Sequence, residues 1–126
     1  GTCITYDYIG SNKIYQGGAI SPGLRMRYES LNKQTKNLPL LDPKLPDTII
    51  GNSTKNSIHS GVVFGIINEI EGVINQYNKE FIDLIVVLTG GDANFLCKQL
   101  KSSIFVFSNF LLEGLNFLLE FNSKKW

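Results

Sequence analysis

A continuous apolar run followed by a pair of glycines is the feature that most constrains the fold of this chain of 126 residues. Leu84–Leu88 reads Leu-Ile-Val-Val-Leu, which is typical of a strand buried on both faces. Thr89-Gly90-Gly91-Asp92 follows, and we expect a short helix from there to about Leu100. Ile104–Phe107 repeats the pattern of a buried strand. Strands that alternate with helices favour an α/β domain with parallel strands.

The last predicted element is a helix over residues 109–122. Its apolar residues recur at helical spacing, and we expect a core-facing side made of Phe110, Leu111, Leu115, Leu118 and Leu119.

The first twenty residues predict an antiparallel hairpin. Thr2–Ile9 is rich in β-branched and aromatic residues, and a second strand runs from Ile14 to about Ile20 after a short polar turn. Gly17 and Gly18 lie inside the second strand, where they indicate a bulge or a close approach by another backbone or a ligand. This hairpin makes the expected sheet mixed.

Two helices are predicted in the middle of the chain. Ser21-Pro22 has the composition of a helix start, with serine as the cap and proline at the first helical position, and residues 37–52 are loop-like. The longest helix is predicted over Thr54–Tyr77, where Gly61 and Gly65 share one face. Because glycine weakens a helix by about 1 kcal/mol relative to alanine, the pair suggests that something packs close to that face. The helical stripes consist of Leu24, Tyr28 and Leu31 in the first helix and of Ile58, Val62, Ile66, Ile70, Val73 or Ile74, and Tyr77 in the second.

Composition argues against several classes of function. Lys plus Arg number 12 and Asp plus Glu number 11, so no strong field favours nucleic acid or a membrane surface. The most apolar stretch, Ile104–Phe121, is interrupted by polar residues, and we expect no membrane span. Cys3 and Cys97 are far apart, so we expect neither a disulfide framework nor a zinc site but two buried thiols in a reducing, cytoplasmic protein.

The glycine pair is the first candidate site. Ligands of open α/β sheets bind outside the carboxyl ends of strands, and Gly90 and Gly91 lack the Cβ atoms that would keep a flat ligand or a phosphate away. The following helix would offer free N–H groups, although Asp92 would equally serve as its cap. A nucleotide site and a tight structural turn both remain open at this point.

Two weaker candidates are rich in hydroxyl groups. Gly1-Thr2 could hold a phosphate through backbone and side-chain donors, and Gly51-Asn52-Ser53-Thr54 would either cap the long helix or bind a small polar substrate. His59, the only histidine, is expected to be a surface or capping residue, and Glu69 and Glu71 are expected to be solvated. The sequence contains no Walker A motif, no Ser-His-Asp set and no cluster of metal ligands.

Four segments in this order and spacing resemble the type III pantothenate kinases. They are Gly1–Thr5, Gly17–Leu24, Thr54–Gly61 and Thr89–Ala93. The resemblance implies an α/β fold that is one half of an actin-like (ribonuclease H-like) ATPase, a mixed sheet with helices packed on it. It also implies that residues 1–126 form the C-terminal half of such a domain.

The function implied by this resemblance is ATP-dependent phosphorylation of pantothenate to 4'-phosphopantothenate, the first step of coenzyme A biosynthesis. The family uses ATP with Mg²⁺ and a monovalent cation, K⁺ or NH₄⁺, and works as a homodimer. The alternatives are a non-catalytic transcriptional accessory protein on the same fold and an actin-like kinase for another small acceptor. By its motifs, the resemblance places the ATP at Gly1, Thr2, Gly90, Gly91 and Asp92, and the pantothenate at Thr54 and more weakly at Gly18 and Ile20.

The family's N-terminal motifs are not found in this sequence. These are an Asp-x-Gly-Asn-Thr phosphate loop, a Gly-x-Asp-Arg segment that carries the proposed general base, and an aspartate that binds the monovalent cation, and all would precede Gly1. Phosphoryl transfer depends on positioning of the reactants and on stabilisation of charge. Each of the three N-terminal motifs contributes to one of these two requirements. We therefore expect no catalytic residue in this chain, no turnover by the chain alone, and self-association through a face that the other half would cover.

Overall fold

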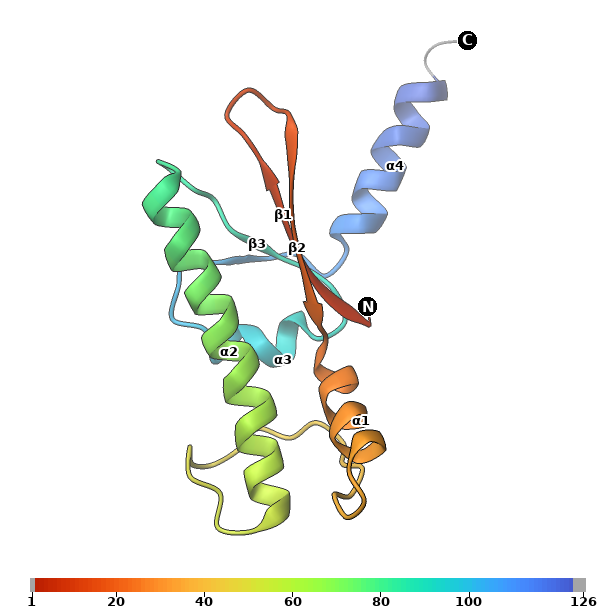
Figure 1. Cartoon of the computed structure of the whole chain (residues 1–126). Coiled ribbons are helices and arrows are strands. Elements are labelled where there is room, and N and C mark those ends of the chain that lie inside the picture. Colours follow the sequence, from red (N-terminus) through yellow and green to blue (C-terminus); the bar gives the residue numbers. More distant parts are fainter. Residues whose placement is uncertain (1, 124–126) are drawn as a thin grey trace. The chain divides into compact units, whose positions relative to one another are not determined.

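The computed structural model of the chain describes residues 2–123, and Figure 1 shows its helices and strands. The chain consists of two compact units, and the boundary between them falls after Glu69, within one long helix. The elements follow the predicted order of two strands, two helices and then strand, helix, strand and helix. Their bounds are β1 Cys3–Ile9, β2 Tyr15–Pro22, α1 Leu24–Gln34, α2 Thr54–Glu80, β3 Val87–Leu88, α3 Ala93–Cys97, β4 Phe105–Val106 and α4 Phe110–Ser123.

Strands β1 and β2 form the antiparallel hairpin that the sequence predicts. Cys3 pairs with Pro22 at one end, and the register shifts between Tyr8 and Ile9. Gly17 lies at this irregularity with φ of +104°, a conformation that L side chains rarely adopt. A Cβ atom on Gly18 would overlap the carbonyl oxygen of Tyr6. The glycine pair therefore serves both predicted purposes, and the close neighbour is the chain's own backbone.

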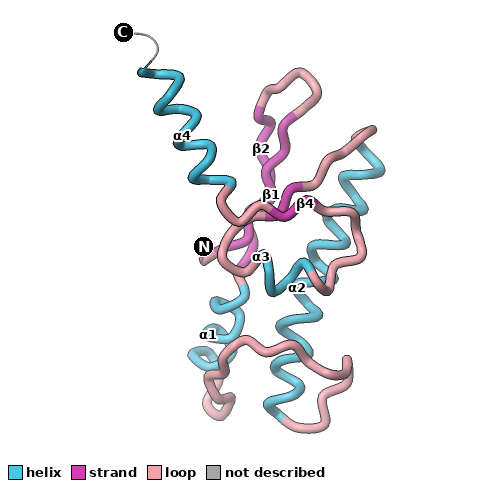
Figure 2. The backbone as a smooth tube through the Cα atoms, turned by 180° about the vertical axis from the view of Figure 1, so that it is seen from behind, coloured by secondary structure: helices cyan, strands magenta, loops and turns pink. Residues whose placement is uncertain are grey.

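Helix α1 begins later than predicted. Ser21 and Pro22 are still paired with β1, and Gly23 takes the N-cap position, so the assignment of Ser21 as cap and Pro22 as first helical residue is wrong. The cause is the hairpin, because its pairing keeps this backbone extended. Leu24 and Tyr28 are buried, as the helical stripe predicts, and residues 35–53 form the expected loop (Figure 2).

Helix α2 supplies most of the core. The predicted stripe is confirmed at every position from Ile58 to Ile74, and Val63 and Ile67 are buried beside it. Ile58 to Ile67 belong to the first unit, and Ile70 and Ile74 to the second. The expectation that something packs close to Gly61 and Gly65 is not met within the described residues. No atom beyond the adjacent helix backbone lies within 4 Å of where their Cβ atoms would be.

The second unit contains a parallel pair of short strands. Val87 pairs with Phe105 and Leu88 with Val106, so the predicted parallel strands are present but only two residues long. The prediction that both are buried on both faces is wrong, since Ile85 is 72% and Phe105 59% exposed. Among the described residues, this pair and the hairpin are separate two-stranded sheets, not one mixed sheet. A two-stranded pair offers too little surface to bury both of its faces.

Helix α4 has no buried residue. The predicted core-facing side chains are about half exposed or more, with Leu111 at 71% and Leu119 at 69%, so that prediction is wrong for this chain. Apolar side chains become buried only where another element offers a surface, and the described residues offer none here.

The two cysteines are free, which agrees with the absence of a disulfide, but they are not buried as expected. Cys3 is exposed and Cys97 is partly exposed. Among residues 2–123 no helix has the length and apolarity needed to cross a membrane.

Candidate functional site

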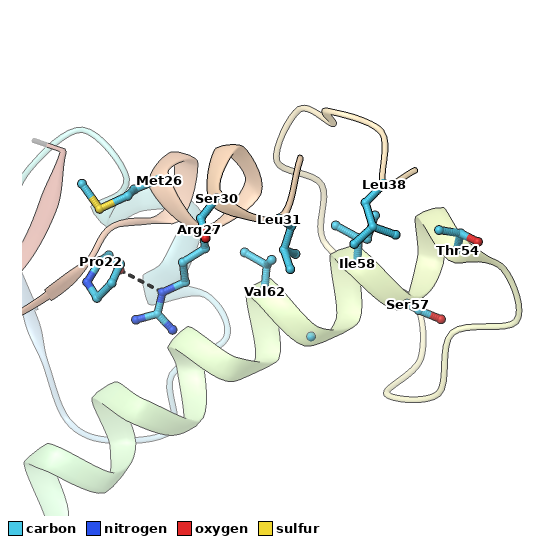
Figure 3. A pocket seen from close by; sticks show the side chains of 11 residues that line it. Pro22, Met26, Arg27, Ser30, Leu31, Leu38, Thr54, Ser57, Ile58 and Val62 are labelled. Atoms are coloured by element: carbon cyan, nitrogen blue, oxygen red, sulfur yellow. Dashed lines mark hydrogen bonds between the residues drawn. The ribbon is translucent and has the colours of Figure 1, made fainter. Parts of the chain in front are cut away.

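A cavity of about 840 Å³ lies between helix α1, the loop that follows it and the first turns of α2 (Figure 3). All of it belongs to the first compact unit. Most of its lining side chains are apolar, with a few hydroxyl groups and one charged group. The residues that line it are Pro22, Met26, Arg27, Ser30, Leu31, Leu38, Thr54, Ser57, Ile58, Gly61 and Val62.

Thr54, the predicted substrate-binding residue, opens helix α2 at this cavity. The sequence left open whether Ser53 or Thr54 caps the helix. The structure assigns the cap to Ser53, whose Oγ accepts a hydrogen bond from the backbone N–H of Asn56 at 3.2 Å. The hydroxyl of Thr54 is therefore not used in capping and remains available to a ligand in the cavity.

Glu69 accepts hydrogen bonds from three other elements of the first unit. The hydroxyl groups of Tyr6 and Ser21 donate to its Oε1 at 2.8 and 2.5 Å, and Nη2 of Arg27 donates to its Oε2 at 2.5 Å. The carboxylate thus connects β1, β2 and α1 to α2. Since Arg27 and Pro22 both line the cavity, this network fixes the wall of the cavity opposite α2.

The pKa of Glu69 reflects these partners. Partial burial raises the pKa, but the hydrogen bonds from Ser21, Arg27 and Tyr6, together with the charge of Arg27, outweigh burial and hold the pKa below its ordinary value. The carboxylate is therefore charged at neutral pH.

His59 packs against a tyrosine and is not the surface or capping residue that we expected. The Tyr28 hydroxyl lies 2.8 Å from its Nδ1, and the rings meet edge to face with centroids 5.6 Å apart. Burial, and then the charge of Lys44, lower the pKa of His59, which favours the neutral ring in this hydrogen-bonded pair. His59 also lines a cavity of about 150 Å³ with Lys44, Asp47 and other loop residues.

The glycine pair after β3 forms a turn with open space beside it. Gly90 has φ of +105° and its carbonyl oxygen accepts from the N–H of Ala93 at 3.1 Å. Apart from their chain neighbours, no atom of residues 2–123 lies within 4 Å of where a Cβ would stand on Gly90 or Gly91. Asp92 occupies the N-cap position of α3 without a side-chain capping bond. Helix α3 has only five residues, so the expected contribution of its N-terminus to anion binding does not apply.

The remaining predicted site residues lie on the hairpin or just before it. Thr2 is exposed directly before β1, and its carbonyl oxygen accepts from the N–H of Gly23 at 3.1 Å. Gly18 and Ile20 lie in β2, where Ile20 is 77% exposed, and neither lines the large cavity. Gly1 lies outside the described residues.

Sequence reasoning missed Arg27 and misjudged Glu69 and Glu71, which it treated as solvated. Glu71 accepts from the N–H groups of Lys101 and Ser102 at 2.5 and 3.1 Å, and from the Ser102 hydroxyl at 2.5 Å. It therefore holds the loop that leads into β4. For Glu69 the sequence held a signal, because Glu69 lies three residues after Ile66 and seven after Val62, on the apolar stripe of the helix. That spacing does not reveal which donors the carboxylate meets.

The family model and the most similar relatives named here point to one family. Residues 1–76 match the sequence model of the type III pantothenate kinase family. A protein of Christiangramia forsetii with the name type III pantothenate kinase is 57% identical over 122 residues, which are 97% of this chain and 50% of that protein. One from Flavobacterium johnsoniae with the same name is 58% identical over 116 residues, 92% of this chain and 48% of that protein.

A solved structure has a similar fold. It is described as a conserved Baf family transcriptional activator from Campylobacter jejuni, and it superposes with a TM-score of 0.62 at 24% identity. The match covers 98% of this chain and 56% of that one. This chain thus spans about half the length of the relatives that it matches. Because the family model matches more than half of the chain, and both named relatives match nearly all of it, the chain belongs to the type III pantothenate kinase family.

Proposed function

We propose that the protein phosphorylates pantothenate with ATP to give 4'-phosphopantothenate, the first step of coenzyme A synthesis in the cytoplasm. In this proposal the chain is the C-terminal half of an actin-like enzyme. The observation that carries it is the identity of 57–58% to named kinases over nearly the whole chain. The length of the relatives supports the proposal that the chain is one half of an enzyme, since the chain spans about half the length of each relative.

The large cavity of the first unit is the proposed acceptor site. Thr54 lines it with a hydroxyl that the helix cap does not use. The apolar wall of Leu31, Ile58 and Val62 suits the dimethyl group of pantothenate, and hydroxyl groups suit its amide and alcohols. A mostly apolar cavity with a few polar groups is the usual form of a small-molecule site. Gly18 and Ile20 lie outside this wall and are the weaker part of the proposal.

ATP is proposed to contact Gly1 and Thr2 with its phosphates and to place its nucleoside beside Gly90, Gly91 and Asp92. The open space beside both glycines supports this. Residues 2–123 contain no group of three or more potential metal ligands, so they do not fit a Mg²⁺ site formed by this chain alone. Mg²⁺ would be bound by the ATP phosphates, and it and the proposed K⁺ or NH₄⁺ would need ligands from the rest of the protein.

This chain's contribution to the chemistry would be to position the acceptor. In the reaction a hydroxyl oxygen of pantothenate forms a bond to the γ-phosphorus of ATP while the bond from that phosphorus to the β–γ bridging oxygen breaks, and the hydroxyl proton passes to a base. Catalysis of such transfers consists mainly of alignment and charge stabilisation. The Glu69 network and the Ser53 cap hold the two walls of the cavity, α1 and the start of α2, in a fixed geometry.

A homodimer is part of the same proposal. The face of α2 at Gly65 supports it, since among the described residues no atom beyond the adjacent helix backbone lies within 4 Å of where a Cβ atom on Gly65 would stand.

Reconstitution tests the proposed function. We would fuse this chain to the half of the Christiangramia forsetii relative that it does not match, and would measure ATP-dependent formation of phosphopantothenate. We expect turnover by the fusion and none by the chain alone. A fusion that is folded and binds ATP but leaves pantothenate unchanged would contradict the proposal.

A regulatory role is the second candidate. It is favoured by one observation, the fold shared with a protein described as a transcriptional activator. The near-balanced charge of 12 basic and 11 acidic residues disfavours direct binding to DNA. Phosphorylation of a sugar or another small acid in place of pantothenate by the same fusion would instead indicate a kinase for a different acceptor.

A further inference from the structure

Arg27 is the only charged residue among those that line the large cavity in the described part of the chain. It lies on α1, and its side chain is only 20% exposed. Because the rest of the wall is largely apolar, few other groups of the cavity could bind an anion, and a charge-assisted hydrogen bond from the guanidinium is stronger than a neutral one.

Three hydrogen bonds hold this side chain in place. Nε of Arg27 donates to the carbonyl oxygen of Pro22 at 2.8 Å, as Figure 3 shows. Nη2 donates to Ser21 at 3.0 Å and to Glu69 at 2.5 Å. An arginine that is already ordered loses little further conformational entropy when it binds a ligand.

The count of donors leaves one edge of the guanidinium unused. The group has five N–H donors, of which the one on Nε and the two on Nη2 are engaged. Within residues 2–123, Nη1 makes no hydrogen bond. Glu69 accepts from Arg27 only at Nη2, and its other oxygen accepts from Tyr6 and Ser21. The ion pair with Glu69 therefore leaves Nη1 of Arg27 without a partner among the described residues. The guanidinium can therefore bind a second carboxylate through Nη1.

We propose that Arg27 binds the carboxylate of the acceptor in this cavity and so selects acids over neutral acceptors. This inference rests on the proposed function, in which Thr54 contacts pantothenate. Pantothenate has a carboxylate at one end and hydroxyl groups at the other. Arg27 from α1 and Thr54 from α2 offer complementary groups within the same cavity. Glu69 acts as the positioning residue that holds Arg27.

The test compares pantothenate with pantothenol, in which a neutral hydroxymethyl group replaces the carboxylate. In the reconstituted fusion we would measure KM, or the inhibition constant where a compound is not turned over, for both. We expect the unaltered protein to prefer pantothenate. Arg27→Gln should raise the constant for pantothenate about tenfold or more, the usual effect of one charge-assisted hydrogen bond, and leave that for pantothenol nearly unchanged.

Arg25→Gln is the matched control, because it removes the same charge from an exposed position on the same helix, and it should change neither constant. Arg27→Lys keeps the charge but not the planar group and should give an intermediate result. A purely structural role for Arg27 would weaken both compounds equally and would overturn the inference. Equal affinity of the unaltered protein for both would overturn it without any variant. If the fusion phosphorylates neither compound, the proposed function itself fails.

Discussion

Glu69 connects three elements of the first unit to α2, because its two oxygens receive side chains from β1, β2 and α1. A carboxylate in this position stabilises the fold as long as it is charged and all three donors face it. At the residue scale, the first unit thus depends on a polar hub near the middle of α2, beside the buried aliphatic side chains of the same helix.

Replacing Glu69 with Gln tests this hub. The folded protein lowers the pKa of Glu69 below its ordinary value of 4.5. Its stabilisation is therefore complete above pH 4.5 and is lost as the pH falls through the lower pKa of the folded state. We expect Glu69→Gln to reduce the free energy of unfolding by about 1–3 kcal/mol at pH 7, and by progressively less in acid. Urea unfolding followed by circular dichroism would measure the difference.

The control for this experiment is Glu80→Gln, which alters an exposed glutamate at the end of the same helix. It should change stability little at any pH. A Glu69→Gln deficit that is the same at pH 7 and well below pH 4.5 would show that shape, not charge, matters at this position.

At the scale of the element, α2 combines two kinds of surface. One face is filled by isoleucine and valine side chains that are buried in the chain. Another carries Gly61, Gly65 and Gly72, which share a narrow stripe at about 100° per residue. A Cβ atom added to any of the three would have no neighbour within 4 Å. The glycines therefore do not serve packing within the described residues.

Substituting Gly65 with Ala separates the two possible reasons for a glycine here. In the chain alone, alanine should stabilise the helix by about 1 kcal/mol, since it is the better helix former and meets no atom. In the reconstituted protein, the added methyl group should weaken homodimer formation if two copies meet at this face. Thermal unfolding of the chain and sedimentation of the fusion measure the two effects. Unchanged dimerisation would remove this face from the proposed interface.

Over the whole molecule, the distribution of apolar residues is uneven. Helix α1 and most of α2 bury their apolar stripes, whereas α4 and the strands of the second unit expose theirs. Large exposed apolar surfaces on soluble proteins mark interfaces or lead to association. The chain alone should therefore self-associate in the micromolar range and above.

Charges placed on α4 test which surface is responsible. At about 100° per residue, Leu115 and Leu118 lie on the apolar face of α4, and Asn116 and Ser123 lie on its polar face. The double variant Leu115→Lys with Leu118→Lys places two charges on the apolar face. The double variant Asn116→Lys with Ser123→Lys places the same two charges on the polar face. We expect the first pair to reduce the sedimentation coefficient at high concentration towards that of a monomer, and the second to leave association in place. A monomeric unaltered chain over a wide concentration range would refute the prediction.

Local pattern was sufficient to predict most elements of this protein. The hairpin, the order of strands and helices and the buried stripe of α2 follow from backbone preferences and from periodicity, which act over a few residues at a time. The motif at Thr54 likewise pointed to the residue that opens α2 at the large cavity, although its role there is still a proposal.

Contacts between distant residues were decided only by the tertiary structure. The start of α1 moved because the hairpin keeps Ser21 and Pro22 in a strand. Glu69, which we expected to be solvated, faces donors that are 42 to 63 positions away in sequence. The physical reason is that apolar spacing records which side of an element avoids water. It does not record which polar groups the fold brings to that side, and these groups shape the cavity around Arg27 and Thr54.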